Sequence, residues 1–132
     1  KKVQSIINCI WDTSGSMNGM HERVLSYIYR NDIAINLIQC DAGVQRVDMV
    51  KSIRDFNAIR LKGMGGTMLQ PAIDLVSEKF DKFNTVILSD GATDTLSFEN
   101  IRGKVLIISC GKNCPVSKDN GKLKQILVEQ NG

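Results

Sequence analysis

The stretch that decides the fold covers residues 3–16 and reads VQSIINCIWDTSGS. Its first nine residues are mostly apolar and rich in β-branched side chains, which is typical of a strand buried on both faces. A cluster of small polar residues follows at once, beginning with Asp12. This order predicts a parallel sheet with polar groups at the carboxyl ends of its strands.

Further strand-like runs lie on the C-terminal side of this stretch. Apolar runs at residues 33–40, 85–89 and 105–109 predict three more buried strands. The polar residues 41–43 read as a turn, so residues 44–50 are expected to return antiparallel as a hairpin strand. The predicted sheet is therefore mainly parallel, with one antiparallel edge strand.

Apolar residues at helical spacing predict helices between these strands. One stripe lies in residues 20–29. The clearest helix opens at Thr67 and has Pro71 in its first turns, where a missing N–H group is tolerated. Its apolar face is expected to comprise Leu69, Ala72, Ile73, Val76 and Phe80.

Two segments near the C-terminus complete the pattern. Residues 94–103 are too short for a long helix and are expected to form a polar crossover. Leu123, Ile126 and Leu127 have the spacing of a final amphipathic helix. Alternating strands and helices predict an α/β fold: a doubly wound, Rossmann-like domain with helices on both faces of the sheet. The 132 residues are expected to form one domain, residues 1–132.

The composition excludes several classes of protein. Hydrophobic residues make up 42% and charged residues 23%, the balance of a globular protein in water, and no apolar run approaches the roughly 20 residues of a membrane-spanning helix. The net charge of +3 is scattered, and the few aromatic residues do not interleave with basic ones, so neither a nucleic acid nor a membrane is expected as a partner. Residues 3–11 are too short and too polar for a signal peptide, so we expect a cytoplasmic location.

The four cysteines are expected to be structural thiols. Cys9, Cys40 and Cys110 lie in or at the end of apolar runs, where a free cysteine behaves as a small hydrophobic residue. Cys110 and Cys114 form a single closely spaced pair with no histidine nearby. Because zinc sites need four clustered ligands, zinc is the weaker reading.

Five oxygen donors are expected to meet at the carboxyl edge of the sheet. They come from the loop after the first strand, from the start of the clearest helix and from the end of the strand at residues 85–89. Carboxylate and hydroxyl oxygens without an imidazole suit Mg²⁺, with Mn²⁺ or Ca²⁺ as alternatives. Mg²⁺ takes six oxygen ligands, so five side chains would leave one position open. Because two carboxylates leave no excess negative charge at a divalent ion, that position would favour an incoming carboxylate of a partner protein. The donors are Asp12, Ser14, Ser16, Thr67 and Asp90.

Three short segments carry a family resemblance. They are residues 12–17 (DTSGSM), residues 65–67 (GGT) and residues 88–91 (LSDG). They resemble the three segments of the metal-ion-dependent adhesion site of von Willebrand factor A (VWA) domains, in the right order over essentially the whole chain. The resemblance implies hydroxyl ligands at Ser14 and Ser16, with Thr67 binding directly or through water.

The same resemblance implies that Asp12 and Asp90 bind the metal or anchor its waters, and that the domain binds proteins. Cys40-Asp41-Ala42 with Val44-Gln45 is similar to compact bacterial or phage VWA-like domains. Such domains often end larger proteins and work beside AAA+ ATPases or metallopeptidase-like segments. These proteins are therefore the expected partners. The resemblance also suggests that the domain is the C-terminal part of a longer protein.

An enzyme remains the alternative. Asp12 follows the first strand, where phosphatases of the haloacid dehalogenase type and response-regulator receivers carry a phospho-acceptor aspartate. Position 14 is Ser, whereas the former need a second Asp there. The chain also lacks the Gly-x-Ser-x-Gly motif of serine hydrolases and the Gly-Lys-[Ser/Thr] ending of phosphate loops. We therefore expect a binding module and not an enzyme.

Overall fold

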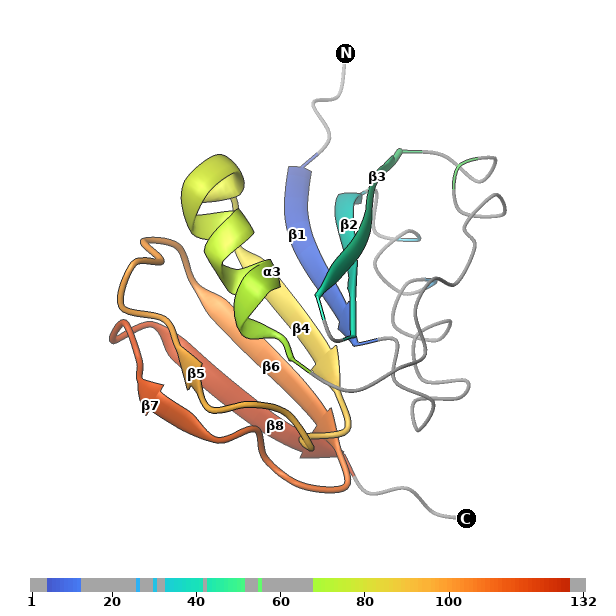
Figure 1. The fold of residues 1–132 in the computed structure, drawn as a ribbon. Coiled ribbons are helices and arrows are strands. Elements are labelled where there is room, and N and C mark those ends of the chain that lie inside the picture. The colour runs from blue at the N-terminus through green and yellow to red at the C-terminus, as the bar shows by residue number, and fades with distance from the viewer. Residues whose placement is uncertain are drawn as a thin grey trace.

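A computed structural model describes the arrangement of most of the chain. Its largest element is a six-stranded sheet with the strand order β3-β2-β1-β4-β6-β8 (Figure 1). The strands are β1 (Ser5–Asp12), β2 (Ile33–Cys40), β3 (Val44–Val50), β4 (Thr85–Ser89), β6 (Val105–Cys110) and β8 (Leu123–Val128). The residues that the structure describes are 5–12, 26, 30, 33–41, 43–51, 55 and 68–128.

The strand pairing confirms the predicted sheet. Strand β1 pairs in parallel with β2 and β4, and β6 pairs in parallel with β4 and β8. Among the described strands only β3 is antiparallel, and it lies at the edge beside β2, as the turn at residues 41–43 predicts. Parallel strands place their carboxyl ends at one edge of the sheet, which is the lower edge in Figure 1.

Side chains alternate between the two faces of the sheet, and each face buries its own cluster. We call the face that packs against the helix α3 (Gln70–Leu75) the helix face; Ile10, Ile38, Ile87 and Ile107 lie on it. The opposite face, here the far face, carries Cys9, Leu37, Leu88 and Cys110. Near-continuous apolar strands are expected when both faces are covered.

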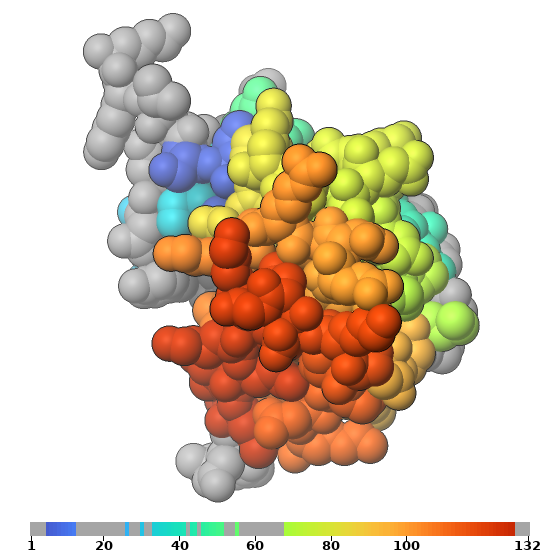
Figure 2. All heavy atoms as spheres, turned by 90° about the vertical axis from the view of Figure 1, so that its left-hand side faces the viewer, coloured from blue at the N-terminus to red at the C-terminus, as the bar shows by residue number. Residues whose placement is uncertain are grey.

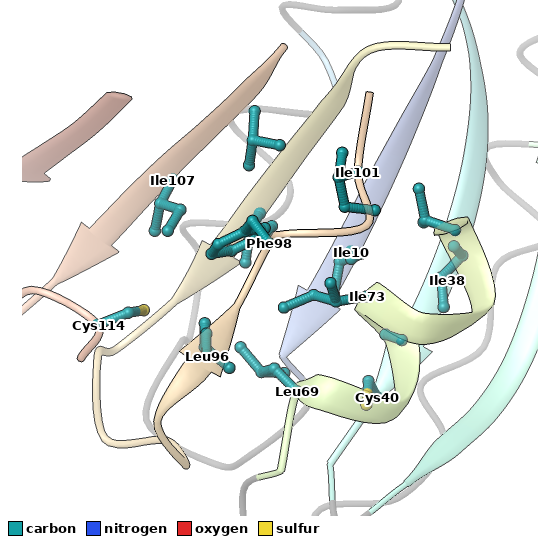
Figure 3. Packing of buried hydrophobic residues seen from close by; sticks show 14 residues of the cluster. Ile10, Ile38, Cys40, Leu69, Ile73, Leu96, Phe98, Ile101, Ile107 and Cys114 are labelled. Carbon is teal, nitrogen blue, oxygen red and sulfur yellow. The ribbon is translucent and has the colours of Figure 1, made fainter. Parts of the chain in front are cut away.

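Helix α3 covers the helix face with the residues that its spacing predicts. Leu69, Ala72, Ile73 and Val76 are buried, and Phe80 packs partly buried against the same cluster. In Figure 3, Leu69 and Ile73 lie between Ile10 and Ile38 of the sheet and Leu96 of a neighbouring segment. The helix begins at Gln70 with Pro71 in its first turn and continues as the π-helical turn η1 (Val76–Phe80). Thr67, where we expected it to open, lies outside the described residues.

The prediction that residues 94–103 form a polar crossover is wrong, because the segment contributes apolar side chains to the core. The segment contains no helix, as predicted, but its short strand β5 (Leu96–Ser97) pairs with β7 (Val116–Lys118), and Leu96, Phe98 and Ile101 are buried in the helix-face cluster. The segment between β6 and β8 also packs there, through Cys114. Both connections therefore form part of the core.

The expected C-terminal helix is also wrong. Residues 123–128 form strand β8, which pairs with β6 over its whole length. Leu123 packs on the helix face, whereas Ile126, the partner of Ile108, lies on the far face. The spacing of the three apolar residues fits a helix as well as a strand, and the neighbouring strand β6 decides between them.

Helices on both faces remain a prediction. The described part of the chain places α3 and η1 on the helix face, and Ser26 is helical, within the stripe predicted at residues 20–29. No helix among the described residues has the length and apolarity needed to cross a bilayer. All four cysteines are free and buried, as is expected of thiols that pack as small hydrophobic residues.

Replacing Phe98 with Ala tests the role of the segment after β5 in the core. Because Phe98 is 1% exposed, we expect the free energy of unfolding to fall by about 3–5 kcal/mol. Glu99→Ala at the adjacent position is the control. The Glu99 side chain is exposed and forms a surface ion pair with Lys118, worth less than about 1 kcal/mol. Urea denaturation measures both changes, and equal losses would contradict the buried position of Phe98.

Candidate functional site

Two of the five predicted donors lie at the carboxyl edge, on the neighbouring strands β1 and β4. Asp12 is the last residue of β1, and Asp90 directly follows β4. The register pairs Trp11 with Leu88, so Asp12 lies beside Ser89. Asp90 is the next residue after Ser89 along the neighbouring strand's path. Ser14, Ser16 and Thr67 lie outside the described residues, so their place at this edge stays a prediction.

Ser89 connects the two carboxylate-bearing segments. Its Oγ donates a hydrogen bond to Oδ2 of Asp12 at 2.8 Å and accepts one from the Gly91 N–H group at 3.1 Å. Both Asp12 and Ser89 have no exposed surface. A buried hydrogen bond to a carboxylate fixes the orientation of that carboxylate, so Ser89 positions Asp12.

No role of Ser89 was predicted from the sequence. The signal was present in the alternation of β4, because Ile87 and Ser89 must point to the same face. A hydroxyl at the end of a buried strand, on the face that carries Asp12, needs a hydrogen-bond partner. The partner is 77 residues away, and only the pairing of β1 with β4 identifies it.

The turn after Asp90 depends on a glycine. Oδ1 of Asp90 accepts a hydrogen bond from the Ala92 N–H group at 2.9 Å, which closes a tight turn around Gly91. Gly91 has a φ of +85°, and a Cβ there would lie 1.9 Å from the carbonyl oxygen of Lys112. Glycine is therefore required for the turn after β4 to pack against the turn after β6.

The chain that follows Thr67 is held at the same edge. The Met68 N–H group donates a hydrogen bond to the carbonyl oxygen of Asp41, and Sγ of Cys40 donates one to the carbonyl oxygen of Met68 at 3.0 Å. Cys40 and Asp41 are the last residue of β2 and the one after it. The first described residue after Thr67 is thus fixed next to the end of β2, the neighbour of β1.

Asp94 joins the start of α3 to the loop after β4. Its Oδ1 accepts a hydrogen bond from the Leu69 N–H group at 2.7 Å, and its Oδ2 accepts one from the Gln70 N–H group at 3.2 Å. These two N–H groups have no partner within the helix, so the carboxylate caps it. This role of Asp94 was not predicted, because the capping carboxylate lies 25 residues after Leu69 and not next to the start of the helix in the sequence.

Two thiols lie close to the carboxylates and remain protonated. Burial raises the pKa of Cys40 to about 12, and it also raises the pKa of Cys114, against a partly opposing effect of hydrogen bonds to Ser109 and Ser89. Neutral thiols are poor metal ligands. Within the described ranges, no group of three or more His, Cys, Asp or Glu side chains could hold a metal ion. The described part of the site therefore contributes the carboxylates of Asp12 and Asp90, with two uncharged thiols nearby.

A comparison with protein-family models identifies the domain. The family described as VWA-like domain (DUF2201) matches residues 7–125. The chain belongs to this VWA-like family. Membership confirms the predicted VWA-like domain, and this kind of domain suggests a protein-interaction module. The metal-ion-dependent adhesion site that the three sequence segments resemble stays a prediction. No curated protein matches the chain.

Replacing Gly91 with Ala tests the geometry of the turn after Asp90. A residue with a side chain is strained at this φ, and its Cβ would displace the Lys112 carbonyl group. We therefore expect the free energy of unfolding to fall by at least about 2 kcal/mol. Gly43→Ala is the control, because a Cβ at Gly43 meets no atom within 4 Å and should change stability by less than about 1 kcal/mol. Thermal melts of both variants measure the difference, and a stable Gly91→Ala protein would disprove the packing of the two turns.

Proposed function

We propose that this VWA-like domain is a metal-dependent protein-binding module and not an enzyme. In this proposal Asp12, Ser14, Ser16, Thr67 and Asp90 hold Mg²⁺, with Mn²⁺ or Ca²⁺ as alternatives. The bound cation would supply a positive charge that accepts an Asp or Glu carboxylate of a partner protein. The observation that carries the proposal is the placement of Asp12 and Asp90 on neighbouring strands, with Ser89 orienting Asp12.

The donor set fits a hard cation. Asp12 brings a carboxylate into a position with no exposed surface, and a buried negative charge is costly unless hydrogen bonds or a cation compensate it. The Ser89 hydroxyl group donates a hydrogen bond to Oδ2 of Asp12. In the same way the Ala92 N–H group engages Oδ1 of Asp90. A hydrogen bond thus helps to orient each carboxylate, as is common for the ligands of a metal.

The charge of the proposed site selects the ligand. Two carboxylates balance a divalent cation, so an incoming carboxylate meets no excess negative charge from the protein. An acidic residue of a partner protein would complete the set of oxygen ligands. The family resemblance makes an AAA+ ATPase or a metallopeptidase-like protein the candidate partner, in the cytoplasm.

The surroundings of Asp12 favour binding over phosphotransfer. A phospho-acceptor carboxylate must be reached by the phosphoryl group in line with the leaving oxygen. Asp12 is fully buried, and its Oδ2 already accepts the Ser89 hydroxyl proton. Both features support the role of Asp12 as an anchoring group.

Calorimetric titration of the chelator-treated protein with Mg²⁺ or Mn²⁺ tests the proposal. We expect saturable binding that is lost in Asp12→Ala and Asp90→Ala, and weakened about tenfold in Ser89→Ala, where only the orientation of Asp12 is disturbed. Asp119→Ala is a matched control for Asp90→Ala. Asp119 closes a similar turn, with its Oδ1 3.0 Å from the Gly121 N–H nitrogen, just before β8 at the opposite edge of the sheet.

Two outcomes would contradict the proposal. Equal Mg²⁺ binding by the wild type and by Asp12→Ala would show that the carboxylate edge does not hold the ion. Labelling of the protein by acetyl phosphate that disappears in Asp12→Asn would instead favour the phosphotransfer alternative. Melting temperatures of all variants, measured without metal, show whether a loss of binding reflects unfolding.

A further inference from the structure

Within the part of the chain that the structure describes, the far face of the sheet is incompletely covered at its β8 end. On the helix face, Val105 and Ile107 of β6 are 2% and 0% exposed. On the far face, Leu106 and Ile108 of the same strand are only half-buried. Farther out on that face, Ile126 of β8 is 44% exposed. The two faces of one strand therefore differ in how completely the chain covers them.

The path of the connections explains this difference. The segment between β4 and β6 places Leu96 and Phe98 in the helix-face cluster, and the segment between β6 and β8 places Cys114 there. The connections from β4 to β6 and from β6 to β8 both lead toward the β8 edge of the sheet. Right-handed connections that lead in the same direction lie on the same face of a parallel sheet. The connections on either side of β6 thus both lie on the helix face, and neither covers the far face of this strand.

The uncovered surface is apolar with a basic border. We call it the β6–β8 patch. Ile108 and Ile126 are direct partners in the parallel register, and Lys124 is the partner of Leu106, so these side chains share the far face. Its apolar members are Val86, Leu106, Ile108, Ile126 and Val128, all half-buried or exposed, and its basic border is Lys104, Lys122 and Lys124, all exposed.

The basic border belongs to a strongly charged part of the chain. Residues 100–128 contain six basic residues and one acidic residue, so this segment carries a net charge of +5, more than the +3 of the whole chain. Lys104 and Lys124 form no ion pair with another described residue. Figure 2 shows this segment, in orange and red, over much of the side of the molecule that carries β7 and β8.

We propose that the β6–β8 patch docks an amphipathic helix of a partner protein, with an aliphatic stripe flanked by Asp and Glu residues. Helices are the elements that cover the faces of parallel sheets, and a stripe of i, i+3, i+4 and i+7 residues matches a row of aliphatic side chains. Acidic flanks would face Lys104, Lys122 and Lys124, so charge complementarity selects this partner. A second copy of the chain would bring like charges together at the same patch.

Fluorescence anisotropy with two synthetic helical peptides of about 20 residues tests the proposal. Both carry the same Leu and Ile stripe, and one has Glu flanks whereas the other has Lys flanks. We expect the Glu-flanked peptide to bind at least about tenfold more tightly, and added salt to reduce the difference. Binding should not require Mg²⁺, which separates this surface from the proposed metal site.

Adjacent residues of β8 supply matched variants. Ile126→Glu should weaken the Glu-flanked peptide about tenfold or more, whereas Leu127→Glu should change its affinity less than about twofold. Leu127 is 47% exposed, close to the 44% of Ile126, but the alternation of β8 places it on the helix face. Lys124→Ala, at an exposed position, should weaken binding and its salt dependence without disturbing the fold.

Four results would overturn the proposal. They are equal affinity for the two peptides, no binding of the Glu-flanked peptide, equal effects of Ile126→Glu and Leu127→Glu, and a dimer in sedimentation experiments that Ile126→Glu dissociates. Flotation of the protein with anionic phosphatidylserine vesicles, lost in Lys124→Ala, would assign the patch to a membrane surface and would also reject a helical protein partner. Circular dichroism melts confirm that each variant is folded.

Discussion

The hydrogen bond between Ser89 and Asp12 joins the carboxyl ends of the two central strands, β1 and β4, and the described part of the site is built around it. A second buried polar contact joins the middle of β1 to the amino end of β4. There Asn8 donates to Oγ1 of Thr85 at 3.2 Å and accepts a hydrogen bond from Asn36 of β2 at 3.1 Å. Since a shift by one residue would leave these buried groups without partners, these polar contacts hold the register.

A fixed register places functional groups accurately at the edge of the sheet. Asp12 and Asp90 come from strands that are neighbours in space but lie far apart in the sequence. The loop after β4 is held by the Gly91 turn and, through Asp94, is attached to the start of α3. Asp12 and Asp90, the two carboxylates that the family resemblance connects with metal binding and that the structure describes, are thus held on a rigid support, as accurate placement of ligands requires.

The two faces of the sheet have different consequences for binding. On the helix face, α3 and the segments with β5 and β7 bury nearly every apolar side chain of β4 and β6. On the far face, burial decreases from Leu37 and Leu88 to Ile108 and then to Ile126. The two proposals therefore concern separate places: the carboxylate edge and the β6–β8 patch. Because one lies at an edge of the sheet and the other on a face, binding at one place would leave the other place accessible.

The sequence by itself determined the elements whose signals are local. The apolar runs predicted β1, β2, β4 and β6, the turn at residues 41–43 predicted the antiparallel β3, and helical spacing predicted the buried face of α3. Asp12 and Asp90 could be brought to one edge because parallel strands end together. Ser14, Ser16 and Thr67 remain predictions.

Only the tertiary structure decided features that depend on distant partners. The apolar spacing at residues 123–128 fits a helix or a strand, and pairing with β6 made it β8. The polar-looking segment after Asp94 became core because it covers the helix face. Ser89 and Asp94 acquired their roles from groups 77 and 25 residues away. Local patterns record which face of an element is apolar, whereas the partner of a buried polar group is defined only when the strands have paired.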